Sequence, residues 1–383
     1  MKLLQGEGLA DAMPTVPIGL IHTAWGGSMI EQWLTNDAIA KCKGADISAH
    51  NENLYDNAVR PYVEMAVKGW VYYQGENNCG GLHGNSGTAS QLASGYACMM
   101  PALVSEFRKV WSAASSTDPQ APFGLVSLSS HDSEGAKDMA SFRWAQQGSM
   151  GTVPNKLMPN TFMAHAFDLQ DPWNGATGAC STVAGAAMMA GYDCSTPWFM
   201  GPSIHPRFKK PVGQRLALGA LKAAYQTGDG AVGGTIKGCL LSPSSLTISF
   251  GMGGARKLQV KSYNQSNVAL SATSILAGGK WMPVHIATGA APGTATLTIP
   301  AGVKPTAVRY GWGGVGTGND PSPNGDDVSC CEGDGLNTPC LPVSCPLVAP
   351  EPKAPFGALP IDPFIAQIVG GKCVCPEPQM CSA

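Results

Sequence analysis

The sequence predicts an α/β fold in which a parallel sheet lies between helices, followed by a smaller antiparallel β unit and a cysteine-rich tail. Strand-like and helix-like segments alternate up to Tyr225, and the strand-like segments are apolar on both faces. Beyond Gly228, short alternating segments such as LTISF, KLQVKSY, ATLTIP and TAVRYGW follow one another between glycines and prolines. We therefore expect an α/β domain over residues 1–228, a β-rich unit over 229–312, and a tail over 313–383 that packs back on the body.

The elements of the α/β domain follow in chain order. The predicted strands are Val16–Trp25, Lys68–Asn78, Phe123–Asp132 and Thr161–Asp171. The predicted helices are Gly26–Cys42, Gln91–Trp111, Asp138–Met150 and Arg207–Tyr225. Each strand ends in polar residues, and the carboxyl ends of parallel strands meet at one edge of a sheet. The sequence thus predicts a functional site where HTAWGG, QGENN, SSHD and DLQD converge.

Composition limits the partners of the chain. Charged residues make up 13% of it and the formal net charge is −2, so it lacks the positive field that holds nucleic acid or an anionic membrane. No run reaches 18 apolar residues, which excludes a transmembrane helix by sequence. The 48 glycines and 30 prolines indicate long loops between regular elements.

Cysteines indicate the compartment. Seven of the thirteen lie in the last 54 residues: Cys330, Cys331, Cys340, Cys345, Cys373, Cys375 and Cys381. None of their spacings is Cys-x2-Cys, so we expect a disulfide-stapled tail rather than structural zinc, in an oxidising compartment. Gln5 and Glu7 interrupt the apolar stretch that an export signal needs, and we therefore expect the natural N-terminus to be missing.

His205 is the candidate catalytic base, because it precedes a predicted helix at the mouth of the sheet. A histidine base requires a nucleophile within hydrogen-bond reach and an acid that orients its imidazole. Glu76 is the first candidate acid, since it ends a predicted strand. Asp168 and Asp171 are alternatives, although Asp168 is equally suited to capping a turn.

Donors for a developing oxyanion are expected from the Trp25–Ser28 turn, where Gly27 allows close approach of backbone N–H groups, and from the side chains of Gln74 and Asn77. The nucleophile stays open. The sequence contains no Gly-x-Ser-x-Gly elbow, and Ser28 and then Ser130 are the serines nearest the predicted edge.

Five segments in order carry a resemblance to a known family: PIGLIHTAWGGSMIEQW, WVYYQGENN, PFGLVSLSS, VPNKLMPNTFMAHAFDL and SIHPRFKKPVGQRLALGA. RYGW and LPIDPFIAQI extend it toward the C-terminus. Together they resemble the sialate O-acetylesterases, of the SGNH-hydrolase class. The resemblance implies a three-layer α/β/α esterase that removes acetyl groups from O-acetylated sialic acid or a related acetylated glycan, without metal or cofactor, in a secreted or lysosomal protein.

Carried over segment by segment, the resemblance makes His205 the base and places Gly27 in the oxyanion block. Gln74 or Asn77 would add to that block, and Glu76 would be the triad acid. Two departures stand out. The family's nucleophile block, Gly-Gln-Ser-Asn-Met, does not occur in this chain, and Ser203 stands where the family often has its acid.

Three functions follow from these observations. The first is a truncated sialate O-acetylesterase, inactive as written, and poorly soluble or unstable because a central strand would be lost. The second is a carbohydrate-binding descendant that performs no chemistry. The third is an esterase acting on other acetylated glycans such as xylan.

Overall fold

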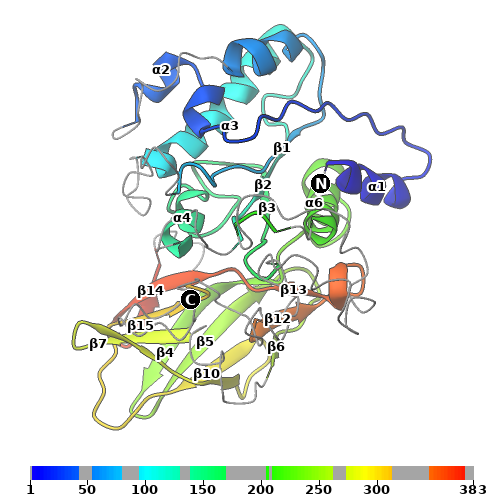
Figure 1. The fold of residues 1–383 in the computed structure, drawn as a ribbon. Helices are drawn as coiled ribbons and strands as arrows, with labels where there is room; N and C mark the ends of the chain where they lie inside the picture. Colours follow the sequence, from blue (N-terminus) through cyan, green and yellow to red (C-terminus); the bar gives the residue numbers. More distant parts are fainter. Residues whose placement is uncertain are drawn as a thin grey trace, which may run out of the picture.

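The computed structural model describes residues 2–42, 54–79, 95–129, 139–169, 204–206, 209–261, 273–312 and 345–375. The described residues form two parts (Figure 1). Helices around a small sheet make the upper part of the view, and a large antiparallel sheet makes the lower part. The upper part carries the segments from which the sequence predicts a functional site.

The small sheet is parallel. Its three strands are β1 (Trp70–Tyr72), β2 (Phe123–Val126) and β3 (Thr161–Ala164), in the spatial order β1-β2-β3. Consecutive parallel strands lie side by side because helices carry the chain back between them. The predicted parallel sheet is therefore confirmed among the described residues, although its strands are shorter than the sequence suggests.

Side chains of β2 alternate between two hydrophobic clusters. Phe123 and Leu125 pack in the cluster that contains helix α3 (Gly95–Ala114). Val126 packs on the opposite face, in the cluster that contains helix α6 (Lys210–Tyr225). Because both faces are covered, every residue of this strand is buried, which is why it reads as a continuous apolar run in the sequence.

Close packing of α6 on the sheet depends on two glycines. A Cβ atom at Gly219 of α6 would lie 2.2 Å from the Phe162 ring, and one at Gly124 of β2 would lie 2.6 Å from it. The Phe162 ring on β3 thus fills the space that both missing side chains leave. Helix α1 (Lys2–Ala12) packs on the outside of α6 (Figure 1).

Two sequence predictions near the N-terminus are wrong. No strand forms over Val16–Trp25, which runs as an extended segment with Trp25 69% exposed, because no neighbouring strand pairs with it. The single helix expected over Gly26–Cys42 is broken into a 3-10 turn (Ile30–Trp33) and the short helix α2 (Asn36–Ile39). The chain is extended at the two residues between them, Leu34 and Thr35, and the Thr35 hydroxyl caps α2 by accepting from the Ala38 amide.

The remaining short helical segments of this part are α4 (Met139–Ala145), a π-helix (Tyr55–Val59) and a 3-10 turn (Arg60–Tyr62). A further 3-10 turn (Pro355–Gly357) lies near the C-terminus.

The large sheet is antiparallel, in the order β8-β7-β11-β14-β15-β4-β5-β10-β9. Its strands are β4 (Gly234–Ser242), β5 (Ser245–Met252), β7 (Thr273–Ala277), β8 (Lys280–Pro283), β9 (Ile286–Thr288), β10 (Thr294–Thr298), β11 (Ala307–Tyr310), β14 (Phe364–Val369) and β15 (Lys372–Val374). A separate three-stranded sheet holds β6 (Gln259–Val260), β12 (Leu347–Pro350) and β13 (Ala358–Pro360). Burial alternates along β4 and β5, as expected for a sheet that buries one face.

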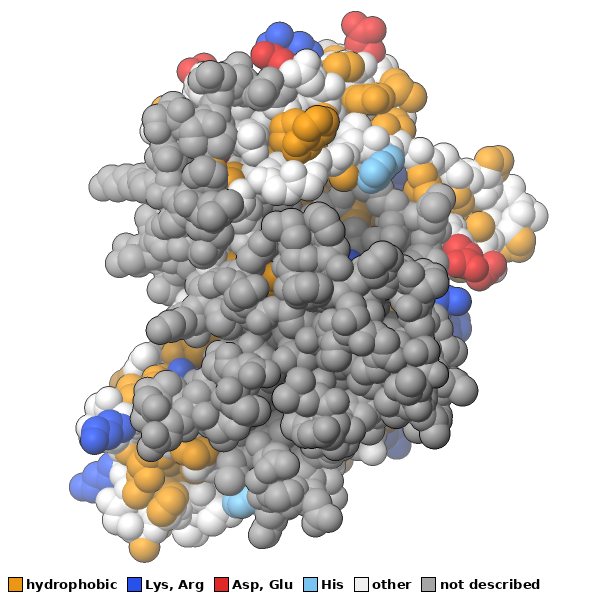
Figure 2. Space-filling view, viewed as in Figure 1, with side chains coloured by type: hydrophobic (Ala, Val, Ile, Leu, Met, Phe, Trp, Pro, Cys, Tyr) orange, Lys and Arg blue, Asp and Glu red, His pale blue; other side chains and the backbone are white. Residues whose placement is uncertain are grey.

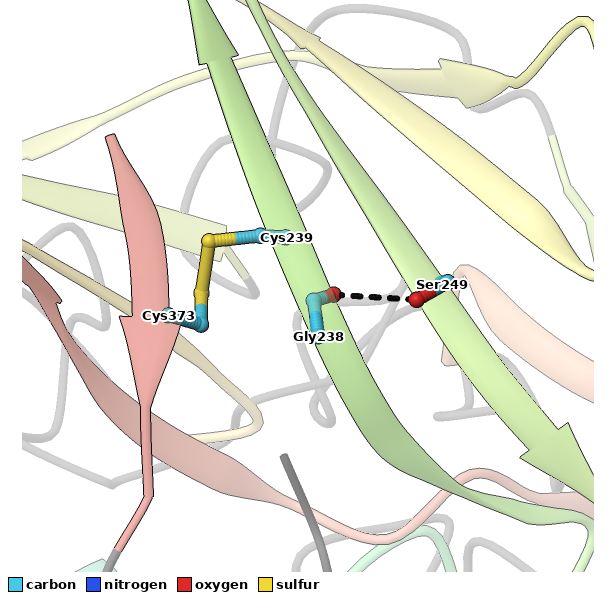
Figure 3. The surroundings of a disulfide bond; sticks show 4 residues. All are labelled: Gly238, Cys239, Ser249 and Cys373. Carbon is cyan, nitrogen blue, oxygen red and sulfur yellow. Dashed lines mark hydrogen bonds between the residues drawn. A yellow bond between two sulfur atoms is a disulfide. The ribbon is translucent and has the colours of Figure 1, made fainter. Parts of the chain in front are cut away.

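Strands from the C-terminal segment complete the large sheet. β14 and β15 lie between β11 and β4, so residues far apart in the sequence become neighbours. The disulfide Cys239–Cys373 joins β4 to β15, and on the other side of β4 the Ser249 hydroxyl donates to the Gly238 carbonyl (3.3 Å, Figure 3). The three-part division at residues 228 and 312 stays a prediction.

Disulfides also occur in the upper part, where Cys42–Cys98 ties the segment after α2 to α3. Cys345 and Cys375 are disulfide-bonded too, as expected for the tail, whereas Cys79 is a buried thiol. Among the described residues no helix is long and apolar enough to cross a membrane. On the face shown in Figure 2, charged side chains of both signs are scattered over the described surface.

Candidate active site

Two of the predicted segments meet at the carboxyl end of β1. The Asn77 side-chain amide donates to the Gly27 carbonyl (2.7 Å), and the Gln74 amide donates to the Ser28 carbonyl (2.9 Å). The turn of WGGS and the strand end of QGENN, about 50 residues apart in sequence, are thus bonded to each other. Gly27 has φ +72°, a conformation that favours glycine.

A buried group of side chains, here called the amide cluster (Gln74, Asn78 and Glu31), holds this junction. Gln74 donates to Asn78 Oδ1 (2.7 Å), which also accepts from the Ile30 amide (2.9 Å). Asn78 donates in turn to Glu31 Oε2 (2.9 Å), and Tyr96 donates to Gln74 Oε1 (2.9 Å). Buried amides that are satisfied in this way fix one arrangement of the chain.

The cluster distinguishes the two candidate amides. Both N–H groups of Gln74 already donate within the protein, to the Ser28 carbonyl and to Asn78. Asn77 uses one N–H for the Gly27 carbonyl and is half-buried, which leaves its second N–H for a ligand. The geometry therefore favours Asn77 over Gln74 as an oxyanion donor.

Sequence reasoning missed Glu31, which is completely buried beside Asn78. Burial raises the pKa of Tyr72 well above its usual value, and the carboxylates of Glu31 and Glu76 add to that rise. Glu31 stands in the same segment as the WGGS turn, in SMIEQW. An acidic residue there, among apolar neighbours, is the only sequence signal of a buried carboxylate.

Glu76 lies beside the same strand end and is half-buried. Its charge, after burial, contributes to the raised pKa of Tyr73, so its carboxylate is within electrostatic reach of that hydroxyl. Its backbone carbonyl accepts a weak bond from the Cys79 thiol (3.5 Å). Glu76 is thus an acidic group at the edge of the sheet, as the sequence predicts for a candidate acid.

Asp168 has a different environment. Arg215 of α6 donates to both of its carboxylate oxygens, at 2.6 and 2.8 Å, and the two side chains are fully buried. The same guanidinium donates to the His165 carbonyl (2.6 Å). Because both carboxylate oxygens of Asp168 already accept from Arg215, they are poorly placed to accept from an imidazole as well. The geometry therefore favours Glu76 as the acid. Asp171 lies outside the described residues.

His205 is half-exposed, between the buried residues Ile204 and Pro206. It precedes α6, and the start of that helix lies beside the end of β1. The Lys209 ammonium donates to the Tyr73 hydroxyl (3.3 Å) and lies 4.5 Å from the centre of its ring. This contact places Lys209, four residues after His205, beside Tyr73, which directly precedes Gln74.

Comparison with known proteins shows which family this chain resembles. Residues 4–190 match the family model described as carbohydrate esterase, sialic acid-specific acetylesterase. The chain is 30% identical to the sialate O-acetylesterases of Homo sapiens and Pongo abelii, over 95% of this chain and 60% of each relative. The mouse sialate O-acetylesterase is 29% identical, over 81% of this chain and 58% of that protein. The chain is thus similar to the sialate O-acetylesterases over most of its own length.

A solved structure agrees at the level of the fold. A carbohydrate acetylesterase from Xanthomonas citri superposes with a TM-score of 0.63 at 21% identity, covering 96% of this chain and 65% of that one. This chain spans about 60% of the length of its curated sialate O-acetylesterase relatives. The family match contains Gly27, Gln74 and Asp168 but ends before His205.

The described residues also contain a serine–histidine–aspartate arrangement that the sequence does not reveal. His165 Nδ1 lies 3.1 Å from Ser127 Oγ, and His165 Nε2 lies 2.6 Å from Asp362 Oδ1. All three residues are buried, and the Ser127 oxygen already accepts the Ala166 amide (3.1 Å). A hydroxyl enclosed in this way is not accessible to an ester, so this arrangement differs from a catalytic triad.

The serines suggested by the sequence are also engaged or lie elsewhere. Ser28 is buried and its oxygen accepts from the Trp33 indole (3.0 Å). Ser130 lies outside the described residues. The nucleophile that the family would supply from its own block is therefore not identified by the described geometry.

Proposed function

We propose that this chain forms the acetyl-ester site of a carbohydrate esterase that removes O-acetyl groups from sialic acids or related glycans. The observation that carries the proposal is the hydrogen bond from Asn77 to the Gly27 carbonyl, because it assembles the two motifs of the family at one strand end. Acyl transfer requires donors aimed at the oxygen that becomes negative, and these two segments offer them.

In the proposed reaction a serine hydroxyl attacks the acetyl carbonyl and forms a tetrahedral intermediate. The Gly27 N–H and the second N–H of Asn77 stabilise the oxyanion. Donors of this kind are worth about 10²–10³ in kcat each, since they are held in place before charge develops. Both are held by the contact between the two segments.

His205 acts as the base that takes the serine proton and gives it to the leaving sugar oxygen, which leaves an acetyl-serine. His205 then takes a proton from a water that attacks this ester and returns it to the serine oxygen, so that acetate is released. Glu76 orients its imidazole in this scheme. The contact of Lys209 with Tyr73 supports this assignment, because it draws the start of α6 toward the residues that surround Glu76. The proposed steps assign each role to a side chain or to a backbone N–H, and none of them calls for a metal or cofactor.

A second function is favoured by one specific observation. The hydroxyls of Ser28 and Ser127 are both buried and hydrogen-bonded. A chain without its nucleophile would keep the polar edge and bind an acetylated sugar without hydrolysing it. This is the carbohydrate-binding alternative. A further alternative is an esterase that acts on other acetylated glycans, such as xylan.

We also propose that the protein works in an oxidising compartment, secreted or lysosomal. The disulfides Cys42–Cys98 and Cys239–Cys373 support this, because such bonds persist outside the reducing cytosol.

The decisive experiment measures acetate release from 9-O-acetylated sialic acid and from acetylated xylan, by this chain and by its His205→Ala variant. The esterase proposal expects release that falls at least about 10²-fold in the variant. A chain that binds the acetylated sugar in calorimetry but releases no acetate would support the binding function instead. Equal release by wild type and variant would contradict the assignment of His205.

A further inference from the structure

A hydrogen-bonded chain crosses from the large sheet to the edge of the parallel sheet. It begins at Asp362, which follows β13 and whose amide donates to the Gly234 carbonyl at the start of β4 (2.9 Å). One carboxylate oxygen accepts from Thr235 (2.6 Å) and Thr152 (3.3 Å). The other accepts His165 Nε2 (2.6 Å), a residue 197 positions earlier.

All groups of this chain are satisfied by one tautomer of the histidine. With the proton on Nε2, His165 donates to Asp362 and its Nδ1 accepts the Ser127 hydroxyl proton. The Ser127 oxygen in turn accepts the Ala166 amide. The three side chains are buried, so a partner that was removed would not be replaced by bulk water.

The backbone of His165 continues the chain toward the candidate base. Its carbonyl accepts from Arg215, and the same guanidinium holds Asp168 by two bonds. Arg215 belongs to α6, the helix that follows His205. α6 is therefore held at two places, by Lys209 against Tyr73 and by Arg215 against the segment after β3.

We propose that His165 is a positioning residue through which Asp362 of the C-terminal part holds α6, and with it His205, at the edge of the parallel sheet. The inference rests on the proposed function for the role of His205, but the coupling itself is a property of the described contacts. Asp362 fixes the imidazole, the imidazole fixes the end of β3, and the His165 carbonyl fixes Arg215. A shift of about 1 Å in a catalytic group is enough to cost about 10²-fold in rate.

A simple cohesive role for the same bonds is the competing explanation, so the test needs a matched control. Glu351 pairs with Arg256 at 2.9 Å, and that guanidinium also donates to the carbonyls of Asp229 and Gly230, just beyond the other end of α6. Glu351→Ala therefore removes an ion pair that involves the C-terminal part without touching the start of α6. Any change that this variant causes at His205 is therefore due to lower stability of the fold alone.

The readout is the rate at which diethyl pyrocarbonate modifies His205, followed on the peptide by mass spectrometry, so it does not require turnover. We expect Asp362→Ala to raise this rate about fivefold, because the start of α6 opens locally more often. Asp362→Asn, which keeps an acceptor for His165 Nε2, should stay near the wild-type rate. Glu351→Ala should lower the melting temperature and leave the His205 rate unchanged.

Thr235→Val is a milder second variant in case Asp362→Ala does not fold, since it removes one bond to Asp362 and leaves His165 paired. It should raise the His205 rate by a smaller factor. If Asp362→Ala or Thr235→Val lowers the melting temperature while the His205 rate stays at the wild-type value, the bonds are cohesive only and the proposal is overturned. If wild type releases no acetate, the proposed function fails, while the modification rates still decide this inference.

In a chain that does release acetate, the same variants separate positioning from binding. Asp362→Ala is expected to lower kcat by about 10- to 10²-fold with KM nearly unchanged, because it displaces the base without removing a substrate contact. An equal loss in Glu351→Ala would contradict this.

Discussion

Two buried polar clusters lie at opposite ends of the same edge of the parallel sheet, and they are built differently. The amide cluster at β1 joins Gln74, Asn78 and Glu31 through neutral amides around one carboxylate. The second, here called the ion-pair cluster, consists of His165, Asp168, Arg215 and Asp362 near β3. The amide cluster adjoins Asn77, which is half-buried, whereas all members of the ion-pair cluster are buried.

This difference indicates that the two clusters have different roles. The amide cluster lies beside the bond between a turn and a strand end, where the proposed function places the donor N–H groups of Gly27 and Asn77. The members of the ion-pair cluster are buried and bind within the protein: Arg215 donates to Asp168, and His165 pairs with Asp362. It joins β3, α6 and the C-terminal part instead. In the proposed function, the amide cluster therefore adjoins the reacting groups, whereas the ion-pair cluster holds the elements around them in place.

The largest expected loss of unfolding free energy follows from a substitution in the ion-pair cluster. Arg215→Met leaves the Asp168 carboxylate buried without its partner, which should lower the free energy of unfolding by about 3–5 kcal/mol. Denaturant unfolding measures it. The double variant Arg215→Met with Asp168→Leu should recover much of the loss, because it removes both charges. A single variant as stable as wild type would show that the pair is not closed to water.

Substitutions in the amide cluster should lower the free energy of unfolding by a smaller amount. Asn78→Ala removes the acceptor of the Ile30 amide and a donor to Glu31, and should cost about 1–3 kcal/mol of unfolding free energy. Ser105→Ala, at an exposed position of α3, is the control and should change stability by less than about 0.5 kcal/mol. A loss in Asn78→Ala that equals the loss in Arg215→Met would remove the distinction between the two clusters.

The smallest effect concerns alkaline pH. Burial, with smaller contributions from nearby charges, raises the pKa of both Tyr72 and Tyr96 above 10.0. Below pH 10 both tyrosines keep their protons whether the chain is folded or unfolded, so they contribute no pH dependence there. Above pH 10 the unfolded chain ionises first, and stability should fall by up to about 1.4 kcal/mol per pH unit for each tyrosine.

Unfolding of wild type and Tyr96→Phe between pH 9 and 11 checks this sign. The variant should lose stability less steeply above pH 10, because one ionising group has been removed from the unfolded chain. Identical slopes would mean that Tyr96 ionises equally in both states.

Sequence reasoning succeeded where a function and its local pattern coincide. The sequence predicts that the QGENN and WGGS segments meet at one edge because each ends or follows an apolar run, and the structure bonds them to each other. The parallel sheet was predicted for the same reason, since continuous apolar runs such as Phe123–Val126 require cover on both faces.

It failed where the outcome depends on a distant partner. The apolar run Val16–Trp25 reads as a strand, yet a strand forms only where another strand accepts its hydrogen bonds. His165 reads as an isolated histidine, because its partner Asp362 is 197 residues away. Asp168 reads as a candidate acid because nothing in its own segment shows that the distant Arg215 pairs with it in the buried interior.

The central claim is that the contact of Asn77 with Gly27 builds an oxyanion site. The most direct test compares kcat/KM for acetate release from 9-O-acetylated sialic acid in wild type and in Asn77→Ala, with the melting temperature measured on the same samples. The account predicts a loss of about 10²–10³-fold in kcat/KM with little change in melting temperature. Full activity in Asn77→Ala, or a folded wild-type chain that releases no acetate, would contradict it.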